Sequence, residues 1–183
     1  MEARLSALLD QQDIRDVVYR YCRGIDRRDF DLVRSCYHKD ATDDHGSFSG
    51  GVEDFVEWVE GLTARYRFTM HLVGQIFVEL ESRPAHTSDP PNAAAAETVG
   101  VSLHRSDDTK PYLNLATGFR YLDRFERRDG GWKIASRKAL GEWSIQLPPD
   151  AWWDIPEAQI ESRRDGTDPL YALLASLGTS AKN

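Results

Sequence analysis

The chain has 183 residues, a hydrophobic fraction of 40% and a formal net charge of −7, which suits a single domain with its own core. The acidic balance makes nucleic acid and anionic membranes poor candidates as partners. The first residues, MEARLSALLDQQDIRD, are charged throughout, and no apolar run reaches the roughly 20 residues that a membrane span needs. We therefore expect a cytoplasmic protein.

The first third of the chain predicts helices. Apolar residues spaced by threes and fours favour a helix over 2–26. Asp29 is placed to cap a short second helix that ends near Tyr37. A third helix is predicted over 52–66, and the turn-rich segment 38–51 before it has room for a short strand.

After Tyr66 the hydrophobic period changes from that of a helix to the alternation of a strand. Four strand-like segments follow, at 67–80, 94–105, 112–127 and 131–146. The last two are joined by Asp129-Gly130-Gly131, a strong hairpin signal. Helices that precede a run of strands indicate an α+β fold, and we expect the long antiparallel sheet to curl around the helices.

Two other segments stand apart from this pattern. Segment 82–94 contains three prolines and is interpreted as a loop. The C-terminal tail, 148–183, contains an amphipathic stretch at 168–178 that predicts a further helix.

Cys22 and Cys36 are the only cysteines, and they lack a paired C-x-x-C spacing. We interpret them as small buried hydrophobes in a reducing compartment. A disulfide between them is the less favoured alternative, because nothing else in the sequence indicates secretion.

Tyr21 and Asp26 continue the apolar stripe of the first helix, where hydrophobic side chains are expected. A carboxylate at such a position is costly unless a partner compensates it. The alternative for Asp26 is a solvated turn residue, or a cap, after a helix that has already ended.

His71 lies in the middle of the first long strand, on a mixed face with Thr69, Val73, Gln75 and Phe77. A face of this composition is typical of the wall of a cavity that is partly apolar and partly wet. The alternative is a core or edge histidine bound to the backbone.

Arg137 alternates along the last strand with Ala135, Ala139, Gly141 and Trp143. These small neighbours leave room above the sheet, where an arginine can hold a developing anion. A solvated strand charge is an equally good interpretation.

The cluster DATDDHG, at 40–46, invites a metal site, but its spacing matches neither a calcium loop nor an H-E-x-x-H zinc site. Turn chemistry explains it better. The sequence also lacks G-x-S-x-G, P-loop and G-x-G-x-x-G motifs, so serine hydrolase and nucleotide-binding functions have no support.

Three segments together resemble the SnoaL-like branch of the nuclear transport factor 2-like superfamily: IRDVVYRYCRGIDRRDFDLVRSCYHKDA, MHLVGQ and YLDRFERRDGGWKIASR. The resemblance covers most of residues 10–145. It implies a cone, in which a curved antiparallel sheet wraps around helices and encloses an apolar pocket. On this basis we expect a cone domain at 1–147 and an extension at 148–183 that covers the pocket or contacts another subunit.

The dehydratase and dehydrochlorinase members of this family, such as scytalone dehydratase, bile acid 7α-dehydratase and hexachlorocyclohexane dehydrochlorinase, match best at the working positions. The resemblance implies that Asp26 supports His71 as a general base, and that Tyr21 and Arg137 stabilise charge on the substrate. The implied reaction is a cofactor-free and metal-free elimination or isomerisation of a mostly apolar, cyclic small molecule of steroid, polyketide or aromatic type. Three aromatic residues are candidates for lining the pocket and binding substrate: Trp58, Phe77 and Trp143.

Other functions remain open for the same pocket. The family includes non-catalytic subunits that resemble the β subunits of ring-hydroxylating dioxygenases, and a base in this position can instead activate water. Family members cover their apolar outer sheet face by forming dimers or trimers, so we expect a homo-oligomer.

Overall fold

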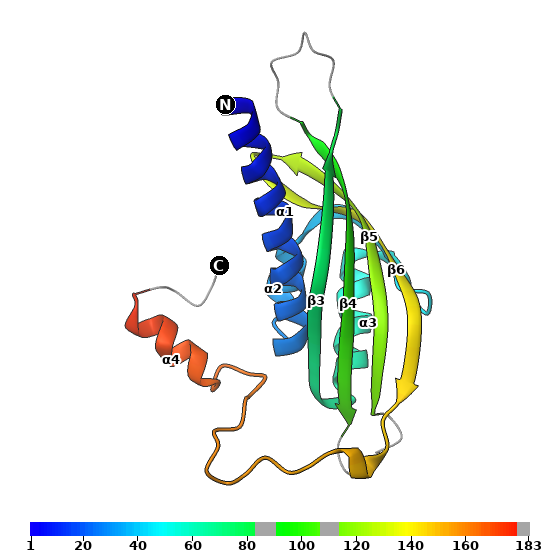
Figure 1. Ribbon diagram of the computed structural model, residues 1–183, viewed down its shortest axis with the longest axis vertical. Helices are drawn as coiled ribbons and strands as arrows, with labels where there is room; N and C mark the ends of the chain where they lie inside the picture. Colours follow the sequence, from blue (N-terminus) through cyan, green and yellow to red (C-terminus); the bar gives the residue numbers. More distant parts are fainter. Residues whose placement is uncertain (83–90, 107–113, 179–183) are drawn as a thin grey trace.

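The computed structural model describes residues 1–82, 91–106 and 114–178. Helices come first and long strands follow (Figure 1). The elements in chain order are α1 (Glu2–Arg27), α2 (Phe30–Ser35), β1 (Tyr37–Asp44), β2 (Ser49–Gly51), α3 (Val52–Thr63), β3 (Tyr66–Leu80), β4 (Ala93–Ser106), β5 (Leu115–Arg128), β6 (Gly131–Gln146), the 3-10 turn η2 (Pro149–Ala151) and α4 (Pro169–Ser176).

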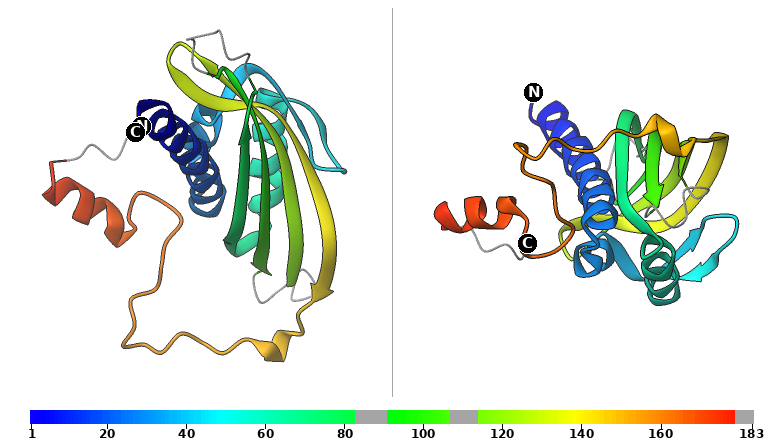
Figure 2. Two further views of the ribbon diagram at one scale, coloured as in Figure 1. Left: turned by 45° about the horizontal axis from the view of Figure 1, so that its top comes forward. Right: turned by 90° about the horizontal axis from the view of Figure 1, so that it is seen from below.

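The strands form one curved sheet in the order β2-β1-β6-β5-β4-β3. Strands β3 to β6 are antiparallel neighbours, as the sequence predicts, whereas β1 pairs with β6 in parallel. The sheet curves around α1 and α3, which lie on its concave face (Figures 1 and 2). The α+β cone expected from the sequence is therefore confirmed.

The buried stripe of α1 ends where the helix turns into α2. Arg28 adopts a left-handed conformation, with φ of 56°, and Asp29 caps α2 by accepting a hydrogen bond from the Leu32 amide at 3.1 Å. A Cβ atom at Gly24 would lie 2.8 Å from a methyl carbon of Val33. Glycine is needed here because the two helices approach so closely.

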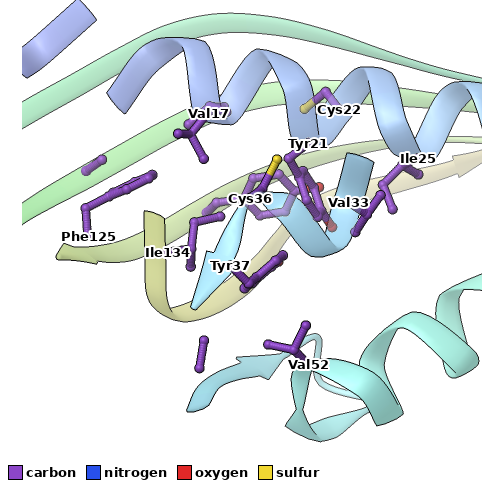
Figure 3. Packing of buried hydrophobic residues seen from close by; sticks show 14 of the residues in the cluster. Val17, Tyr21, Cys22, Ile25, Val33, Cys36, Tyr37, Val52, Phe125 and Ile134 are labelled. Carbon is purple, nitrogen blue, oxygen red and sulfur yellow. The ribbon is translucent and has the colours of Figure 1, made fainter. Parts of the chain in front are cut away.

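The core lies between α1, α2, α3 and the concave face of the sheet. Figure 3 shows Val17, Tyr21 and Ile25 of α1 pointing toward α2 and the strands. Cys22 and Cys36 belong to the same cluster, and both are free thiols. The interpretation of both cysteines as small buried hydrophobes is confirmed.

An irregularity in β3 reverses the side-chain alternation. The pairing of β3 with β4 shifts between Val73 and Ile76, so both of these residues pack against the core. Phe77 consequently points away from it and is 61% exposed. A bulge of this kind inserts an extra residue and moves everything beyond it to the other face.

A second irregularity has the same effect in β6. The pairing of β5 with β6 shifts between Gly118 and Phe119, and beyond this shift Trp143 lies over Gly118 on the convex face, 47% exposed. The predicted hairpin between these strands is present. Asp129 and Gly130 have φ of 52° and 81°, as a two-residue type I′ turn requires.

The extension after β6 runs past the ends of the neighbouring strands and then turns up beside α1 to reach α4 (Figures 1 and 2). Several contacts hold it. The Leu147 amide donates to the Asn114 carbonyl at 2.9 Å, Arg105 lies 5.3 Å from the centre of a Trp152 ring, and Arg67 pairs with Glu161. Asp168 caps the predicted C-terminal helix at 3.1 Å from the Leu170 amide.

The remaining expectations have mixed outcomes. Most of the proline-rich segment 82–94 lies outside the described residues, and its last two residues, Ala93 and Ala94, belong to β4. Within the described part of the chain, none of the helices has the length and apolarity needed to cross a membrane.

Candidate active site

A cavity of about 240 Å³ opens between α1, α3 and the concave face of the sheet. Its wall is mostly apolar, with a few polar groups, as is usual for small-molecule sites. It contains three histidines, His45, His71 and His104, and four large aromatic residues, Tyr21, Trp58, Phe119 and Tyr121.

Asp26 holds His71 by two hydrogen bonds. His71 Nδ1 donates to one carboxylate oxygen at 2.7 Å, and the His71 backbone amide donates to the other at 2.8 Å. The side chains of His71 and Asp26 are only 8% and 14% exposed. Because Nδ1 is bound to the carboxylate, Nε2 is the ring nitrogen left for a ligand in the cavity.

The fold explains why this pair forms. Asp26 lies in the last turn of α1, two residues before the left-handed Arg28 that ends the helix. His71 comes from the middle of β3, the strand along which α1 packs. The predicted contact between a carboxylate at the helix end and a strand histidine is present.

Tyr21 is buried, lines the cavity and lies one turn before Asp26 on α1. Burial raises the pKa of Tyr21 well above its ordinary value, although the nearby Arg137 opposes the shift. The phenol therefore keeps its proton and can donate a hydrogen bond to a ligand.

Arg137 lies outside the cavity, contrary to its expected contact with substrate. It pairs with Asp123 on β5, the residue directly opposite, by two hydrogen bonds of 2.7 Å. Both side chains are fully buried, and the guanidinium lies 4.1 Å from the ring centres of Tyr21 and Tyr121. These two rings separate Arg137 from the cavity, so it supports the wall and does not reach a ligand.

The three aromatic residues expected to bind substrate have different locations. Trp58 of α3 lines the cavity. Phe77 and Trp143 lie on the convex face of the sheet, because the irregularities in β3 and β6 invert the alternation on which their assignment depended. The assignment of these two residues to the pocket wall was wrong.

The cavity contains a second histidine–aspartate pair, which the sequence analysis missed. His45 Nδ1 donates to Asp43, whose other carboxylate oxygen accepts a hydrogen bond from the Tyr37 hydroxyl at 2.7 Å. The side chain of Asp43 is 0% exposed and that of His45 is 17% exposed. Both residues belong to the cluster interpreted as turn chemistry, although their two-residue spacing after a strand could have indicated one shared face.

The other members of that cluster point elsewhere. Asp40 pairs with Arg128 at 2.6 Å, and Asp44 accepts a hydrogen bond from the Gly46 amide at 3.0 Å. Among the residues that the structure describes, no group of three histidine, cysteine or acidic side chains is arranged to hold a metal ion.

His104 occupies the wall beside His71, with ring centres 6.4 Å apart. Burial lowers the pKa of His104 to about 4, and the nearby His71 adds to the shift. Its Nδ1 atom is buried and has no hydrogen-bond partner among the described residues. His104 is therefore a neutral imidazole in the wall of the cavity.

Arg164, from the extension, binds the end of α1 and the start of β3. Its guanidinium donates to the Asp26 carbonyl at 3.0 Å, to the Tyr66 carbonyl at 2.8 Å and to the Thr69 hydroxyl at 3.2 Å. Burial lowers the pKa of Arg164 to about 10, and Asp26 opposes that shift. No local pattern indicates this contact, since Arg164 and Asp26 are 138 residues apart in the chain.

The sequence profile of the SnoaL-like domain matches residues 6–138, whereas comparison with curated proteins gave no match. The solved structures that are similar include the following three. They are a type 2 hexachlorocyclohexane dehydrochlorinase (TM-score 0.70, 19% identity, 85% of this chain and 99% of that chain), a candidate scytalone dehydratase from Novosphingobium aromaticivorans (0.66, 17%, 85% and 98%), and a candidate aromatic ring hydroxylase from the same species (0.57, 18%, 73% and 94%).

At these identities the structural likeness shows the fold alone. The profile match, in contrast, extends over more than half of the chain and includes the helix end and the strand that hold the Asp26–His71 pair. The chain belongs to the SnoaL-like family.

Proposed function

We propose that the protein is a cofactor-free lyase that removes a proton from carbon in a small, mostly apolar, ring-containing molecule and expels a leaving group. The observation that carries this proposal is the hydrogen bond between His71 Nδ1 and Asp26 at the wall of an apolar cavity. Imidazole is suited to this task because its ordinary pKa lies near neutrality.

Each polar group has a distinct part in the proposed reaction. His71 Nε2 accepts the proton, while Asp26 fixes the tautomer and orientation of the ring and stabilises the imidazolium that forms. The protonated phenol of Tyr21 donates to the oxygen on which enolate charge develops. In a cavity that excludes water, these contacts count for more than they would in solution.

The volume of the cavity limits the substrate. About 240 Å³ is the liquid volume of roughly eight water molecules at about 30 Å³ each, which suits one or two rings. Two of the similar structures are a dehydrochlorinase and a candidate scytalone dehydratase, which supports elimination as the reaction class.

We also infer that residues 148–178 cover the mouth of the cavity. The extension runs past the ends of the neighbouring strands (Figures 1 and 2), and Arg164 joins it to the Thr63 carbonyl, at 3.4 Å, as well as to Asp26. Thr63 itself lines the cavity.

A binding or assembly role is the second candidate, favoured by the similarity to a candidate aromatic ring hydroxylase. A non-catalytic module would be expected to have a filled cone and a histidine turned away from the carboxylate. The open cavity and the Asp26–His71 contact support the lyase instead.

The test uses three probes with the full chain. These are 3-hydroxy-1-tetralone, which loses water to give fluorescent 1-naphthol, hexachlorocyclohexane, which loses hydrogen chloride, and 1-tetralone, whose C2 hydrogens exchange in heavy water. We expect His71→Asn to lower the rate on any accepted probe by about 10²–10⁴-fold. Asp26→Asn should cause a similar loss, because Asn can stabilise the wrong tautomer of the ring.

Leu72→Ser is the matched control. Leu72 follows His71 in the same strand, points to the convex face and is 55% exposed, so its replacement should leave turnover unchanged. Full turnover in His71→Asn, or no reaction and no exchange with any probe, would remove the proposal.

A further inference from the structure

The His45–Asp43 pair offers the cavity a second titratable imidazole. The ring of His45 stacks on Phe55, with centres 5.1 Å apart, and lines the cavity beside Trp58. Its Nδ1 is bound to Asp43, so Nε2 is the nitrogen available to a ligand. This arrangement repeats that of the His71–Asp26 pair in the same cavity.

A row of ring contacts connects the two histidines. His71 lies 5.7 Å from Phe119, Phe119 lies 4.5 Å from Tyr121, and Tyr121 lies 5.8 Å from His45, measured between ring centres. Phe119 can occupy this position because Gly100, beneath it, has no Cβ. A Cβ there would lie 2.5 Å from the Phe119 ring. The histidines therefore face one ligand from different sides.

The charges around the two pairs differ. Near Asp26, the guanidinium of Arg164 bonds the Asp26 carbonyl at 3.0 Å and supplies a positive charge. Near Asp43, the cation is Arg137, but its two hydrogen bonds of 2.7 Å are made to Asp123. Among the described residues, no arginine or lysine bonds the Asp43 carboxylate, whose side chain is 0% exposed.

This difference separates the surroundings of the two pairs. Besides Asp43, the groups around His45 are the phenols of Tyr21, Tyr37 and Tyr121 and the Arg137–Asp123 ion pair. With Arg137 balanced by Asp123, the buried Asp43 carboxylate is bonded by the His45 ring and the Tyr37 hydroxyl, and of these two groups only the imidazole can carry a positive charge. The Asp26–His71 pair differs, because the guanidinium of Arg164 lies beside it.

We propose that His45, oriented by Asp43, is the general acid that protonates the leaving oxygen while His71 removes the proton from carbon. This inference rests on the proposed lyase function and specifies its substrate as an alcohol that loses water. A hydroxyl leaves poorly without a proton, whereas a halide needs none.

The C–H bond breaks and its proton passes to His71 Nε2, and the electron pair forms the new C=C bond. The C–O bond breaks, its electron pair stays on oxygen, and that oxygen receives the proton of His45 Nε2 to leave as water. The two imidazoles exchange protonation states, which proton transfer with solvent restores.

The experiment compares two leaving groups on one ring system, 3-hydroxy-1-tetralone and 3-chloro-1-tetralone, with the spontaneous reaction of the chloride subtracted. His45→Asn keeps an N–H for Asp43 but has no acidic proton. We expect it to lower kcat/KM for the alcohol by about 10²–10⁴-fold and to leave the chloride unchanged. His71→Asn should lower both, because both reactions begin at the same C–H bond.

Each other outcome has a definite meaning. An equal loss on both compounds, or no loss on either, overturns the assignment of His45. Undiminished turnover in His71→Asn instead overturns the lyase proposal itself, whatever His45→Asn does. Melting temperatures verify folding, and His45→Gln is a second variant that places its amide nearer Nε2.

A measurement on the unaltered protein makes the test independent of folding. In the uncatalysed reaction the chloride reacts faster than the alcohol. A general acid at the leaving group speeds the alcohol, so the ratio of the two rates should be smaller with the protein than without it. A ratio as large as the uncatalysed one would contradict the proposal.

Discussion

The two histidine–aspartate pairs are assembled in different ways. His71 and Asp26 are 45 residues apart, and Arg164 beside them comes from the far end of the chain. His45 and Asp43 are two residues apart at the end of one strand, packed against tyrosines and the Arg137–Asp123 pair. One pair depends on the docking of helix, strand and extension, whereas the other is local and depends on its burial.

This comparison shows that the same hydrogen-bonded pairing of histidine with aspartate can be held in place by different parts of the fold. The Asp26–His71 pair, whose carboxylate is partly exposed, is expected to be affected by substitutions in the extension. The Asp43–His45 pair, whose carboxylate is fully buried, is expected to be affected by substitutions in the core. Four substitutions test this difference.

The largest effect, a loss of stability, is expected from Arg137→Met, which removes the buried cation near the Asp43–His45 pair. Asp123 and Asp43 would then be two buried carboxylates without a guanidinium, and breaking a buried ion pair typically costs about 3–5 kcal/mol. Urea unfolding measures the loss. Arg124→Met, on the neighbouring strand at a position 60% exposed, should change stability by no more than about 0.5 kcal/mol. Similar values for the two variants would show that the buried pair is not a structural anchor.

The next largest effect is a pH dependence of the free energy of unfolding, caused by His104 beside His71. Because burial lowers the pKa of His104 from 6.5 to about 4, the unfolded chain binds a proton between these values and the native chain does not. The free energy of unfolding therefore falls as the pH drops from 6.5 toward 4, by up to about 3 kcal/mol from this residue.

His104→Gln removes that proton. The variant should lose less stability than the natural chain between pH 7 and pH 4, while the difference between the two stays constant above pH 7. Unfolding free energies at several pH values measure the slopes. Parallel slopes in both proteins would contradict the assignment of a neutral, buried His104.

A smaller effect is expected from Arg164→Met, which keeps an unbranched apolar side chain but removes the donors of the guanidinium. Hydrogen bonds from charged groups contribute about 1.5–3 kcal/mol when buried. Because Arg164 is partly exposed, we expect a smaller effect on the site, a tenfold loss of kcat/KM, which corresponds to about 1.4 kcal/mol. The extension should also become a better protease substrate. Arg163→Met is the matched control, since within the described part of the chain the side chain of exposed Arg163 bonds only Thr167, at 3.2 Å. Equal behaviour of the two variants would separate the extension from the site.

The smallest effect is expected from Phe77→Ser. Phe77 lies on the convex face, away from both pairs, so kcat/KM should be unchanged and unfolding should shift by no more than about 0.5 kcal/mol. Val78→Ser, one residue along, replaces a side chain only 5% exposed and should destabilise the fold clearly. A loss of turnover with Phe77→Ser would mean that the convex face contributes to the site.

Local patterns predicted much of the fold and half of the site. The apolar stripe of α1 and the mixed face of β3 made Tyr21, Asp26 and His71 candidates, and the resemblance to the SnoaL-like family selected them for the site. The extent of the strands, the caps and the type I′ hairpin followed from turn and capping chemistry.

The errors came from features without a local signal. Alternation alone cannot reveal a bulge, so Phe77 and Trp143 were assigned to the wrong face of the sheet. The partner of Arg137 depends on the register of β5 with β6, which a single sequence does not determine. Asp43 and His45 resembled turn residues because their burial arises from the packing of α3 and β5 over them.

The buried thiols have a practical consequence for work on this protein. Burial raises the pKa of Cys22 to about 12 and also raises that of Cys36, so neither forms the nucleophilic thiolate at neutral pH. One cysteine introduced on the extension would therefore react alone with a maleimide dye, without replacement of native residues. Fluorescence from that single label could follow, in real time, the movement of the segment between β6 and α4.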